Sequence, residues 1–207
     1  MKRIRYDNDN DTFLKLQRTR WLKYDVIPHD EVNDFVYEIF DEIKDYINND
    51  IVNWLDIGCG SGMINIPIFN TLQGGHIFLL DKSLLEKDKR VNSFGSTDSF
   101  GFYANLAKAK NLLVLNDIPN SSITTLTPEE LYKVTGGLDL VISRFSWCFH
   151  YPYKTYSDFV YKKLNVNGRV IVDCRNIEKK NIIQDNRFRW KIIKKGKKSV
   201  LLLGEKI

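Results

Sequence analysis

The chain contains few of the residues that build disulfide frameworks and metal centres. Its 207 residues include three cysteines and three histidines. Cys59, Cys148 and Cys174 form no Cys-x-x-Cys pair, so neither a disulfide scaffold nor a zinc site is indicated. We therefore expect no metal site, and thiols in the reduced form that is usual in the cytoplasm.

Long apolar segments are missing as well. No stretch approaches the roughly 18–20 consecutive apolar residues that a membrane-spanning helix needs. Residues 1–7 are basic but lack the apolar core of a signal peptide. The composition, 43% hydrophobic and 28% charged, is ordinary for a globular protein. We expect a cytoplasmic protein that does not bind membranes, and the sequence indicates no particular oligomeric state.

The net charge of +5 is modest, but the positive residues are unevenly distributed. Lysines crowd the C-terminal segment at Lys191, Lys194, Lys195, Lys197 and Lys198. Such a stretch can attract RNA or another polyanion. It can also keep an edge strand from pairing with another sheet. We favour the second interpretation, because no aromatic residues alternate with the lysines, and nucleic acid is the less favoured partner.

The most informative segment is residues 53–62, which read NWLDIGCGSG. A short apolar run leads into glycines at alternate positions, which is typical of a buried strand that turns directly into a helix. Glycine lets the backbone adopt positive φ and approach a ligand closely. The spacing differs from the G-x-G-x-x-G of dinucleotide sites, and no G-K-[ST] of a phosphate loop follows. The segment therefore predicts a site for another nucleotide-like cofactor.

With Asp56 two residues before the first glycine, the pattern D-x-G-x-G-x-G resembles motif I of the class I S-adenosylmethionine-dependent methyltransferases. The resemblance covers about residue 51 to the C-terminus. It implies S-adenosyl-L-methionine as cofactor and S-adenosyl-L-homocysteine as product. It also implies that Asp56 lies near the cofactor's ammonium group. The backbone of the loop, Gly58, Cys59, Gly60, Ser61 and Gly62, would pack on its amino-acid and ribose parts.

A second acid supports this interpretation. The apolar segment 76–80 reads as a strand and ends at Asp81, roughly the 20 residues after Gly58 that a βαβ unit requires. An acid in this place can accept hydrogen bonds from both ribose hydroxyls of an adenosine. The predicted cofactor site is completed by residues at the ends of other strands: Lys82, Thr127, Ser143 and Arg144.

The order of the expected elements is that of the methyltransferases. We predict an α/β fold with a doubly wound, mostly parallel seven-stranded sheet and a C-terminal antiparallel hairpin. Residues 51–207 form this domain. For the third strand we prefer residues 122–126 to 112–115, because the latter continue a helical period. The hairpin pairs residues 190–193 with 199–203 around a turn at Gly196.

Residues 1–50 read as a helical extension. One helix is expected over 11–21, and a second begins at Pro28 with an apolar stripe that runs to Ile47. In the family that the sequence resembles, such an extension covers the cofactor or shapes the substrate entrance. The polar segment 82–99 is a candidate for a functional loop.

The segment after the fourth strand, 138–143, should face the transferred methyl group. Methyltransferases that act on adenine or cytosine amino groups carry a Pro-Pro pair here, and residues 143–146 do not. Residues 146–152, SWCFHYP, are instead similar to the same segment of small-molecule methyltransferases, notably sugar O-methyltransferases. This similarity implies a hydroxyl of a small polar molecule as methyl acceptor.

Transfer to a hydroxyl requires a base, and His150 is the histidine placed at a strand's carboxyl end among aromatic residues. A structural histidine is the alternative. Asp173, at the end of the fifth strand, is the second candidate base or the residue that orients His150. Arg144 is a candidate for binding an anionic group. Candidate substrate-binding residues are Trp147, Tyr151, Tyr153 and Arg175, although the aromatic residues can equally pack against the N-terminal helices.

Three functions fit these residues. The first is an enzyme that methylates a small polar metabolite, such as a sugar or nucleotide-sugar. The second is an RNA methyltransferase, whose binding should weaken steeply with salt. The third is a non-catalytic partner that has kept the cofactor site. Fold alone does not choose among them.

Overall fold

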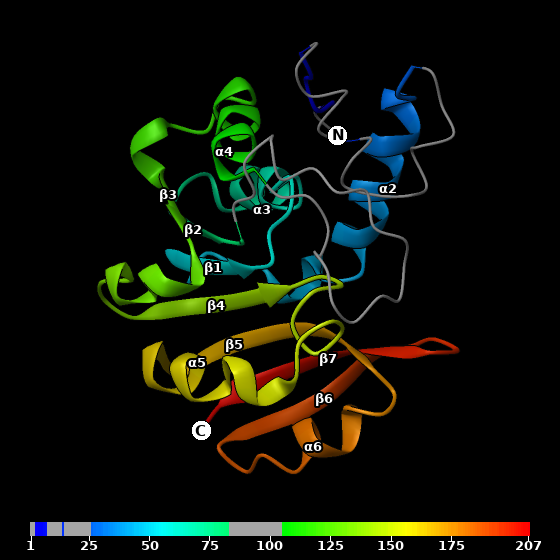
Figure 1. Ribbon diagram of the computed structural model, residues 1–207, viewed down its shortest axis with the longest axis vertical. Helices are drawn as coiled ribbons and strands as arrows, with labels where there is room; N and C mark the ends of the chain where they lie inside the picture. Colours follow the sequence, from blue (N-terminus) through cyan, green and yellow to red (C-terminus); the bar gives the residue numbers. More distant parts are fainter. Residues whose placement is uncertain (1–2, 8–13, 15–25, 83–104) are drawn as a thin grey trace.

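The computed structural model describes residues 3–7, 14, 26–82 and 105–207. A seven-stranded sheet lies at its centre, with the strand order β3-β2-β1-β4-β5-β7-β6 (Figure 1). The strands are β1 Asn53–Ile57, β2 His76–Leu80, β3 Ile123–Leu126, β4 Leu138–Ser143, β5 Leu164–Arg175, β6 Phe188–Lys195 and β7 Ser199–Lys206. The first five are parallel, and β7 runs antiparallel between β5 and β6. This confirms the predicted fold class.

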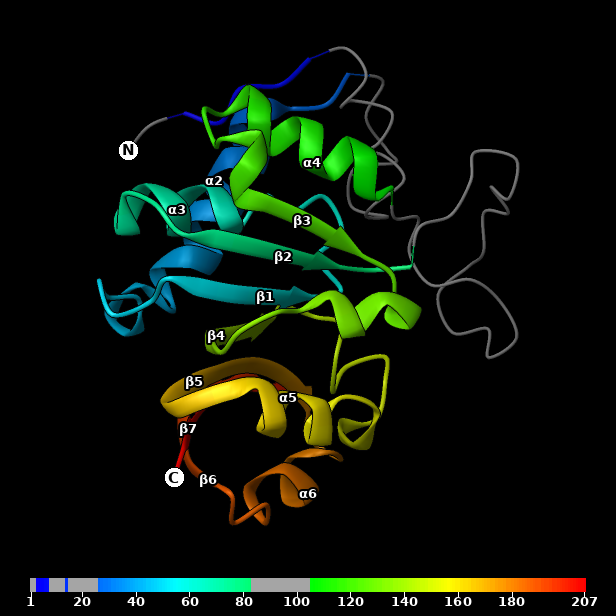
Figure 2. The same ribbon diagram turned by 90° about the vertical axis from the view of Figure 1, so that its left-hand side faces the viewer.

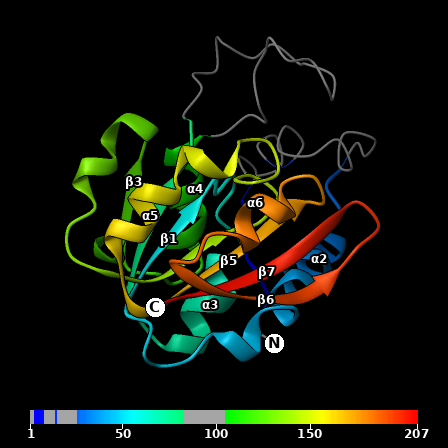
Figure 3. The ribbon, with the colours of Figure 1, turned by 90° about the horizontal axis from the view of Figure 1, so that it is seen from below.

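Helices cover both faces of the sheet. The α-helices are α2 His29–Asp41, α3 Asn65–Leu72, α4 Leu106–Leu115, α5 Ser157–Lys163 and α6 Lys179–Ile183. Short 3-10 helices are η1 Lys44–Tyr46, η3 Asn120–Ser122, η4 Pro128–Lys133 and η5 Tyr153–Thr155. Seen from below, α2 and α6 lie on opposite sides of β7 (Figure 3).

Alternate residues of each strand enter two separate hydrophobic cores, as the pleat of a strand requires. On β2, Ile77 and Leu79 pack with α2, α3 and α4, whereas Phe78 and Leu80 pack with α5 and α6. All four side chains are at most 5% exposed. A strand buried on both faces reads as an unbroken apolar run, which is why the parallel strands could be found in the sequence.

The third strand occupies residues 123–126, as preferred from the sequence. Residues 112–115, the rejected alternative, form the last turn of α4. This helix begins after Asn105, whose side-chain oxygen accepts a hydrogen bond from the Lys108 backbone N–H at 3.0 Å. Both hairpin strands are longer than predicted, because pairing in the sheet extends them beyond their apolar centres.

The second predicted helix ends earlier than its apolar stripe. The α2 helix stops at Asp41, because Ile43 leaves the helical region with φ −122°, and η1 follows. Ile43 and Ile47 are nevertheless buried, at 0% and 6% exposure. The helix predicted for residues 11–21 lies outside the described residues except for Leu14, which is buried. Of the predicted loop 82–99, only Lys82 is described.

The carboxyl ends of β1, β2 and β3 point to one edge of the sheet (Figure 2). Gly60, Asp81 and Ser146, which come shortly after β1, β2 and β4, lie at this edge, which is where open α/β sheets bind ligands. No helix in the described part of the chain is long and apolar enough to cross a membrane.

Candidate active site

The glycine loop between β1 and α3 has a left-handed backbone at alternate positions. The φ angles are 70° at Gly58, 56° at Gly60 and 72° at Gly62. A Cβ atom at Gly58 would lie 1.8 Å from Ser146 Oγ and 2.2 Å from Ser146 Cβ. Glycine is thus required at position 58 both by its backbone and by the segment after β4 that packs on it.

Backbone hydrogen bonds fix this loop to the end of β2. Gly58 N and Cys59 N both donate to the Leu80 carbonyl, at 2.7 and 3.1 Å. Gly60 N donates to Asp81 Oδ2 at 2.8 Å, and Lys82 N donates to Asp81 Oδ1 at 2.7 Å. The structure therefore brings together the two features found in the sequence, the glycine loop and the acid after the second strand.

Asp56 lies beneath the loop and is only 2% exposed. Its Oδ2 accepts a hydrogen bond from Asn65 Nδ2 at 2.7 Å. Asn65 also donates to the Gly62 carbonyl at 2.9 Å and accepts from Trp54 Nε1 at 2.8 Å. Asn65 therefore ties the acid, the loop and β1 together. Sequence analysis missed it, although a buried asparagine in the apolar first turn of α3 was a signal for it.

Both acids are poorly solvated. Burial raises the pKa of Asp56 to about 7, with a further contribution from the negative charge of Asp81, while the Asn65 hydrogen bond opposes it. Burial also raises the pKa of Asp81 to about 6, against the hydrogen bonds from Gly60 and Lys82. A ligand that offers hydroxyl donors or a positive charge would compensate these carboxylates. The glycine loop and the acids are therefore chemically suited to a polar, partly cationic ligand.

The other residues predicted around the loop have identifiable places. Cys59 is half-buried, and burial raises the pKa of its thiol well above the usual value. Ser61 is 7% exposed. Thr127 follows β3 beside Asp81 and forms a capping box with Glu130 at the start of η4, where Thr127 N donates to Glu130 Oε2 at 3.0 Å. The residues described contain no group of three side chains placed to hold a metal ion.

The segment after β4 is held against the glycine loop. Ser143 Oγ donates to the Ile57 carbonyl at 2.7 Å and accepts from Trp147 N at 2.9 Å. Phe145 and Cys148 adopt left-handed φ of 65° and 66°, which folds the segment tightly. Ser143 is fully buried, so it acts as a link between the ends of β4 and β1.

Arg144 does not have the place expected of an anion-binding residue. Its side chain is 5% exposed, and its Nε donates to Asp173 Oδ2 at 2.5 Å. Its Nη1 donates to the Ile39 carbonyl at 2.9 Å, and its Nη2 donates to Glu42 Oε2 at 2.6 Å. These bonds connect β4 and β5 with α2. Asp173 is therefore an ion-pair partner of Arg144, and the roles predicted for these two residues at the site remain predictions.

The side chains of Trp147 and Tyr153 are buried and pack against each other. They are 1% and 6% exposed, and their rings stack with centroids 5.4 Å apart. Trp147 Nε1 donates to the Tyr153 carbonyl at 2.9 Å, and the Tyr153 hydroxyl donates to Asp185 Oδ2 at 2.8 Å. This burial favours the packing role that the sequence analysis left open for the aromatic residues, and their substrate role remains a prediction. Aromatic packing in a core gives the same sequence signal as an aromatic substrate site.

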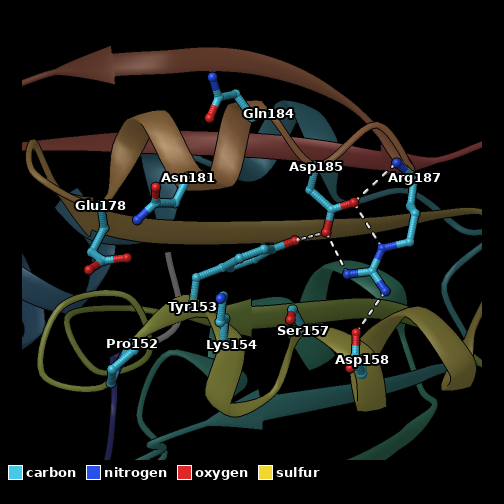
Figure 4. A pocket seen from close by; sticks show the side chains of 10 residues that line it. All are labelled: Pro152, Tyr153, Lys154, Ser157, Asp158, Glu178, Asn181, Gln184, Asp185 and Arg187. Carbon is cyan, nitrogen blue, oxygen red and sulfur yellow. Dashed lines mark hydrogen bonds and ion pairs between the residues drawn. The ribbon is translucent and has the colours of Figure 1, made fainter.

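A polar cleft of about 620 Å³ lies between α5 and α6 (Figure 4). Tyr153 lies at its base, and Arg187 closes one end by pairing with Asp185 and Asp158 (Figure 4). These pairs neutralise the guanidinium, and neither Asp81 nor any residue of the glycine loop lines the cleft. We therefore do not place the reaction there.

His150 lies in the segment after β4, close to Phe149 and to Arg175 at the end of β5. Its ring is 5.3 Å from that of Phe149, and the Arg175 guanidinium lies 5.1 Å from the Phe149 ring centroid. Partial burial and the positive charge of Arg175 lower the pKa of His150. The imidazole is therefore neutral near physiological pH. On the other side, the Lys82 ammonium lies 5.8 Å from the ring of Tyr151, next to Asp81.

Comparison with protein-family models finds no match, and comparison with curated protein sequences finds none either. Solved structures do share the fold. An rRNA methylase from Streptococcus thermophilus aligns with 83% of this chain and 96% of its own, at 16% identity and a TM-score of 0.55. Magnesium protoporphyrin IX methyltransferase from Synechocystis, with bound S-adenosylmethionine, aligns with 98% of this chain and 99% of its own. Its identity is 16% and its TM-score 0.56.

A 16S rRNA N2 G1207 methyltransferase from T. thermophilus, in complex with S-adenosylmethionine and guanosine, is similar over 83% of this chain and 43% of its own. Its identity is 11% and its TM-score 0.59. These proteins act on different acceptors and have the same sheet. At such low identity the similarity establishes the fold, which is that of the class I methyltransferases.

Proposed function

We propose that this protein is an S-adenosylmethionine-dependent methyltransferase, and that it transfers the methyl group to a hydroxyl of a small polar molecule such as a sugar or nucleotide-sugar. The observation that carries the proposal is the hydrogen bond from Gly60 N to Asp81 Oδ2 at 2.8 Å. It joins a close-approach glycine backbone to a partly dehydrated carboxylate at the edge of the sheet where this fold binds ligands.

Different residues around the glycine loop would bind different parts of the cofactor. Asp81 is placed to accept hydrogen bonds from the ribose hydroxyls, and Asp56 and Asn65 support the loop on the side expected for the ammonium group. The backbone of residues 58–62 offers contact along the amino-acid part. When bound, the cofactor supplies a methyl group on a sulfonium, which is open to in-line attack by a nucleophile.

His150 would accept the proton of the attacking hydroxyl at an imidazole nitrogen. Its lowered pKa keeps it neutral and therefore able to take up this proton near neutral pH. The His150 backbone N–H donates to the Ser146 carbonyl at 2.7 Å, and Ser146 packs on Gly58. The candidate base and the cofactor loop thus belong to one connected unit, which supports a common role.

Methyl transfer to a panel of acceptors tests the proposal. Protein is incubated with methyl-labelled S-adenosylmethionine and sugars, nucleotide-sugars or RNA, as wild type and as His150→Gln. We expect transfer to a small polar acceptor and a loss of about 10²-fold or more in kcat for His150→Gln. His76→Gln is the matched control, because His76 lies at the opposite end of β2 and contacts Thr124 Oγ1 at 2.9 Å.

Three other outcomes of this assay would each support a different conclusion. Full activity of His150→Gln would remove the base assignment but leave the methyltransferase. Transfer to RNA that weakens steeply with salt would replace the small acceptor by RNA. Tight cofactor binding with no transfer to any acceptor would indicate the non-catalytic partner.

A further inference from the structure

The basic residues around the carboxyl end of β5 differ from Arg144 and Lys194, which lie nearby and are paired with acids. Arg175, Lys197 and Lys198 are exposed, and no carboxylate in the described part of the chain forms an ion pair with them. In contrast, Arg144 pairs with Asp173 and Glu42, and Lys194 pairs with Glu42. Positive charge is thus left uncompensated beside the candidate base.

The backbone places these three residues together. Arg175 N donates to the Cys148 carbonyl at 3.2 Å, which fixes it to the segment after β4. On the other side, Asn176 N donates to the Lys198 carbonyl and Asn176 Nδ2 to the Lys197 carbonyl, both at 3.2 Å. The tip of the β6–β7 hairpin therefore lies on the same side of the sheet as the end of β4 (Figure 1).

The geometry of Arg175 suits an oxyanion. Its guanidinium lies over the ring of Phe149, with 5.1 Å between the guanidinium carbon and the ring centroid. An arginine stacked in this way keeps its N–H groups available at the edge, in the planar fork that matches a phosphate. Long, flexible lysine side chains at the adjoining turn can add point charges. Glu178, three residues beyond Arg175, is the nearby acid, so positive charge predominates.

We propose that the methyl acceptor carries a phosphate group, and that Arg175 binds this phosphate together with Lys197 and Lys198. The inference rests on the proposed function, because it names the substrate class of the same site. The phosphate can belong to a small nucleotide derivative or to the backbone of RNA. In both cases Phe149 and His150 would lie next to the part of the acceptor that adjoins the phosphate.

Binding measured by calorimetry tests this inference on the full chain. The protein is first titrated with S-adenosylhomocysteine, and the saturated protein is then titrated with pyrophosphate, uridine diphosphate or a 12-nucleotide oligouridylate. The variants are Arg175→Gln and the double change Lys197→Gln with Lys198→Gln. The matched control is Arg189→Gln, which removes the same charge from a side chain that is 72% exposed near the other end of β6.

We expect at least one phosphate probe to bind, about tenfold or more weakly to Arg175→Gln and about threefold or more weakly to the lysine variant. Arg189→Gln should change the affinity less than twofold. An RNA source predicts tighter binding of the oligonucleotide, with a log–log salt slope of about −2 for three phosphate contacts. A nucleotide source predicts that uridine diphosphate binds at least as tightly, with a smaller slope.

Two results would overturn the inference while leaving the methyltransferase in place. These are S-adenosylhomocysteine binding without binding of any phosphate probe at millimolar concentration, and equal effects of Arg175→Gln and Arg189→Gln. If S-adenosylhomocysteine itself does not bind, the proposed function fails. The acceptor assignment then fails with it, whatever the phosphate probes do.

Discussion

The two halves of the carboxyl edge are built in different ways. In the first half, after β1 and β2, backbone atoms and two poorly solvated acids define the site, and Gly58, Gly60 and Asp81 are fixed by hydrogen bonds. In the second half, after β4 and β5, side chains define it, with aromatic rings and cations at the surface. One half is therefore fixed by its backbone, whereas the other is defined by side chains at the surface; this is the arrangement expected if the first half binds the proposed cofactor and the second the methyl acceptor.

Two arginines in the second half differ in their burial and in their partners. Arg144 follows β4 and Arg175 ends β5. The side chain of Arg144 is 5% exposed and bound to Asp173, Glu42 and the Ile39 carbonyl. Arg175 is exposed and lies over Phe149. The first holds α2 to the sheet, and the second is available to a ligand.

The largest effect is expected from a substitution that removes the ion pair between Arg144 and Asp173. Arg144→Ala should lower the free energy of unfolding by about 3–5 kcal/mol, because the buried Asp173 and the partly buried Glu42 would both lose the guanidinium that pairs with them. Arg175→Ala, in contrast, should cost less than about 1 kcal/mol, since it removes an exposed cation from an aromatic ring. Urea denaturation of both variants measures the difference, and equal losses would show that the contrast between the two arginines is wrong.

The next effect concerns the packing of the two halves on each other. Gly58→Ala should destabilise the protein by about 2–4 kcal/mol, from a left-handed alanine and a forced shift of Ser146. Gly136→Ala is the matched control, because Gly136 has φ 79° but open space around it. It should cost only about 1 kcal/mol. Adding Ser146→Gly to Gly58→Ala should restore part of the loss, and no restoration would contradict the predicted clash.

The acids of the first half predict an effect of pH. The pKa of Asp81 is raised to about 6 and that of Asp56 to about 7, so between pH 4 and 7 the folded state binds more protons than the unfolded state. Stability should therefore fall as pH rises through this window, by about 2 kcal/mol for Asp81 alone.

The affinity for S-adenosylhomocysteine should change in the opposite direction, because the ionised carboxylates are the better acceptors. We expect about tenfold tighter binding at pH 8 than at pH 5 in calorimetry. Asp81→Asn should reduce both pH dependences. An affinity independent of pH in the wild type would indicate that Asp81 does not contact the ligand.

The smallest effect is expected at Lys82 and Tyr151, where the two halves of the edge meet. Lys82→Ala should weaken S-adenosylhomocysteine binding by only about two- to fivefold, because an exposed ammonium 5.8 Å from the Tyr151 ring contributes about 0.5–1 kcal/mol. Tyr151→Phe keeps the ring and should change the affinity less. A loss of more than tenfold for Lys82→Ala would make Lys82 a principal cofactor ligand.

The first half could be predicted well from the sequence, and the second could not. Local patterns specify the glycine loop, and buried parallel strands give unbroken apolar runs, so the loop, Asp81 and the order of the elements along the chain were all accessible. Arg144 receives its partners from α2, far away in the chain, and no local pattern shows such a pair. Trp147 and Tyr153 carry the same residue types as an aromatic substrate site, and only their burial distinguishes the two.

The central claim is that the glycine loop and Asp81 bind the cofactor of a methyltransferase, and a direct measurement is calorimetric titration of the purified protein with S-adenosylhomocysteine. We predict one site per chain with a dissociation constant on the order of micromolar, as for typical enzyme ligands. We also predict that Asp81→Asn weakens it. Absence of binding at millimolar concentration would contradict the account and remove the basis of every catalytic role proposed for this edge of the sheet.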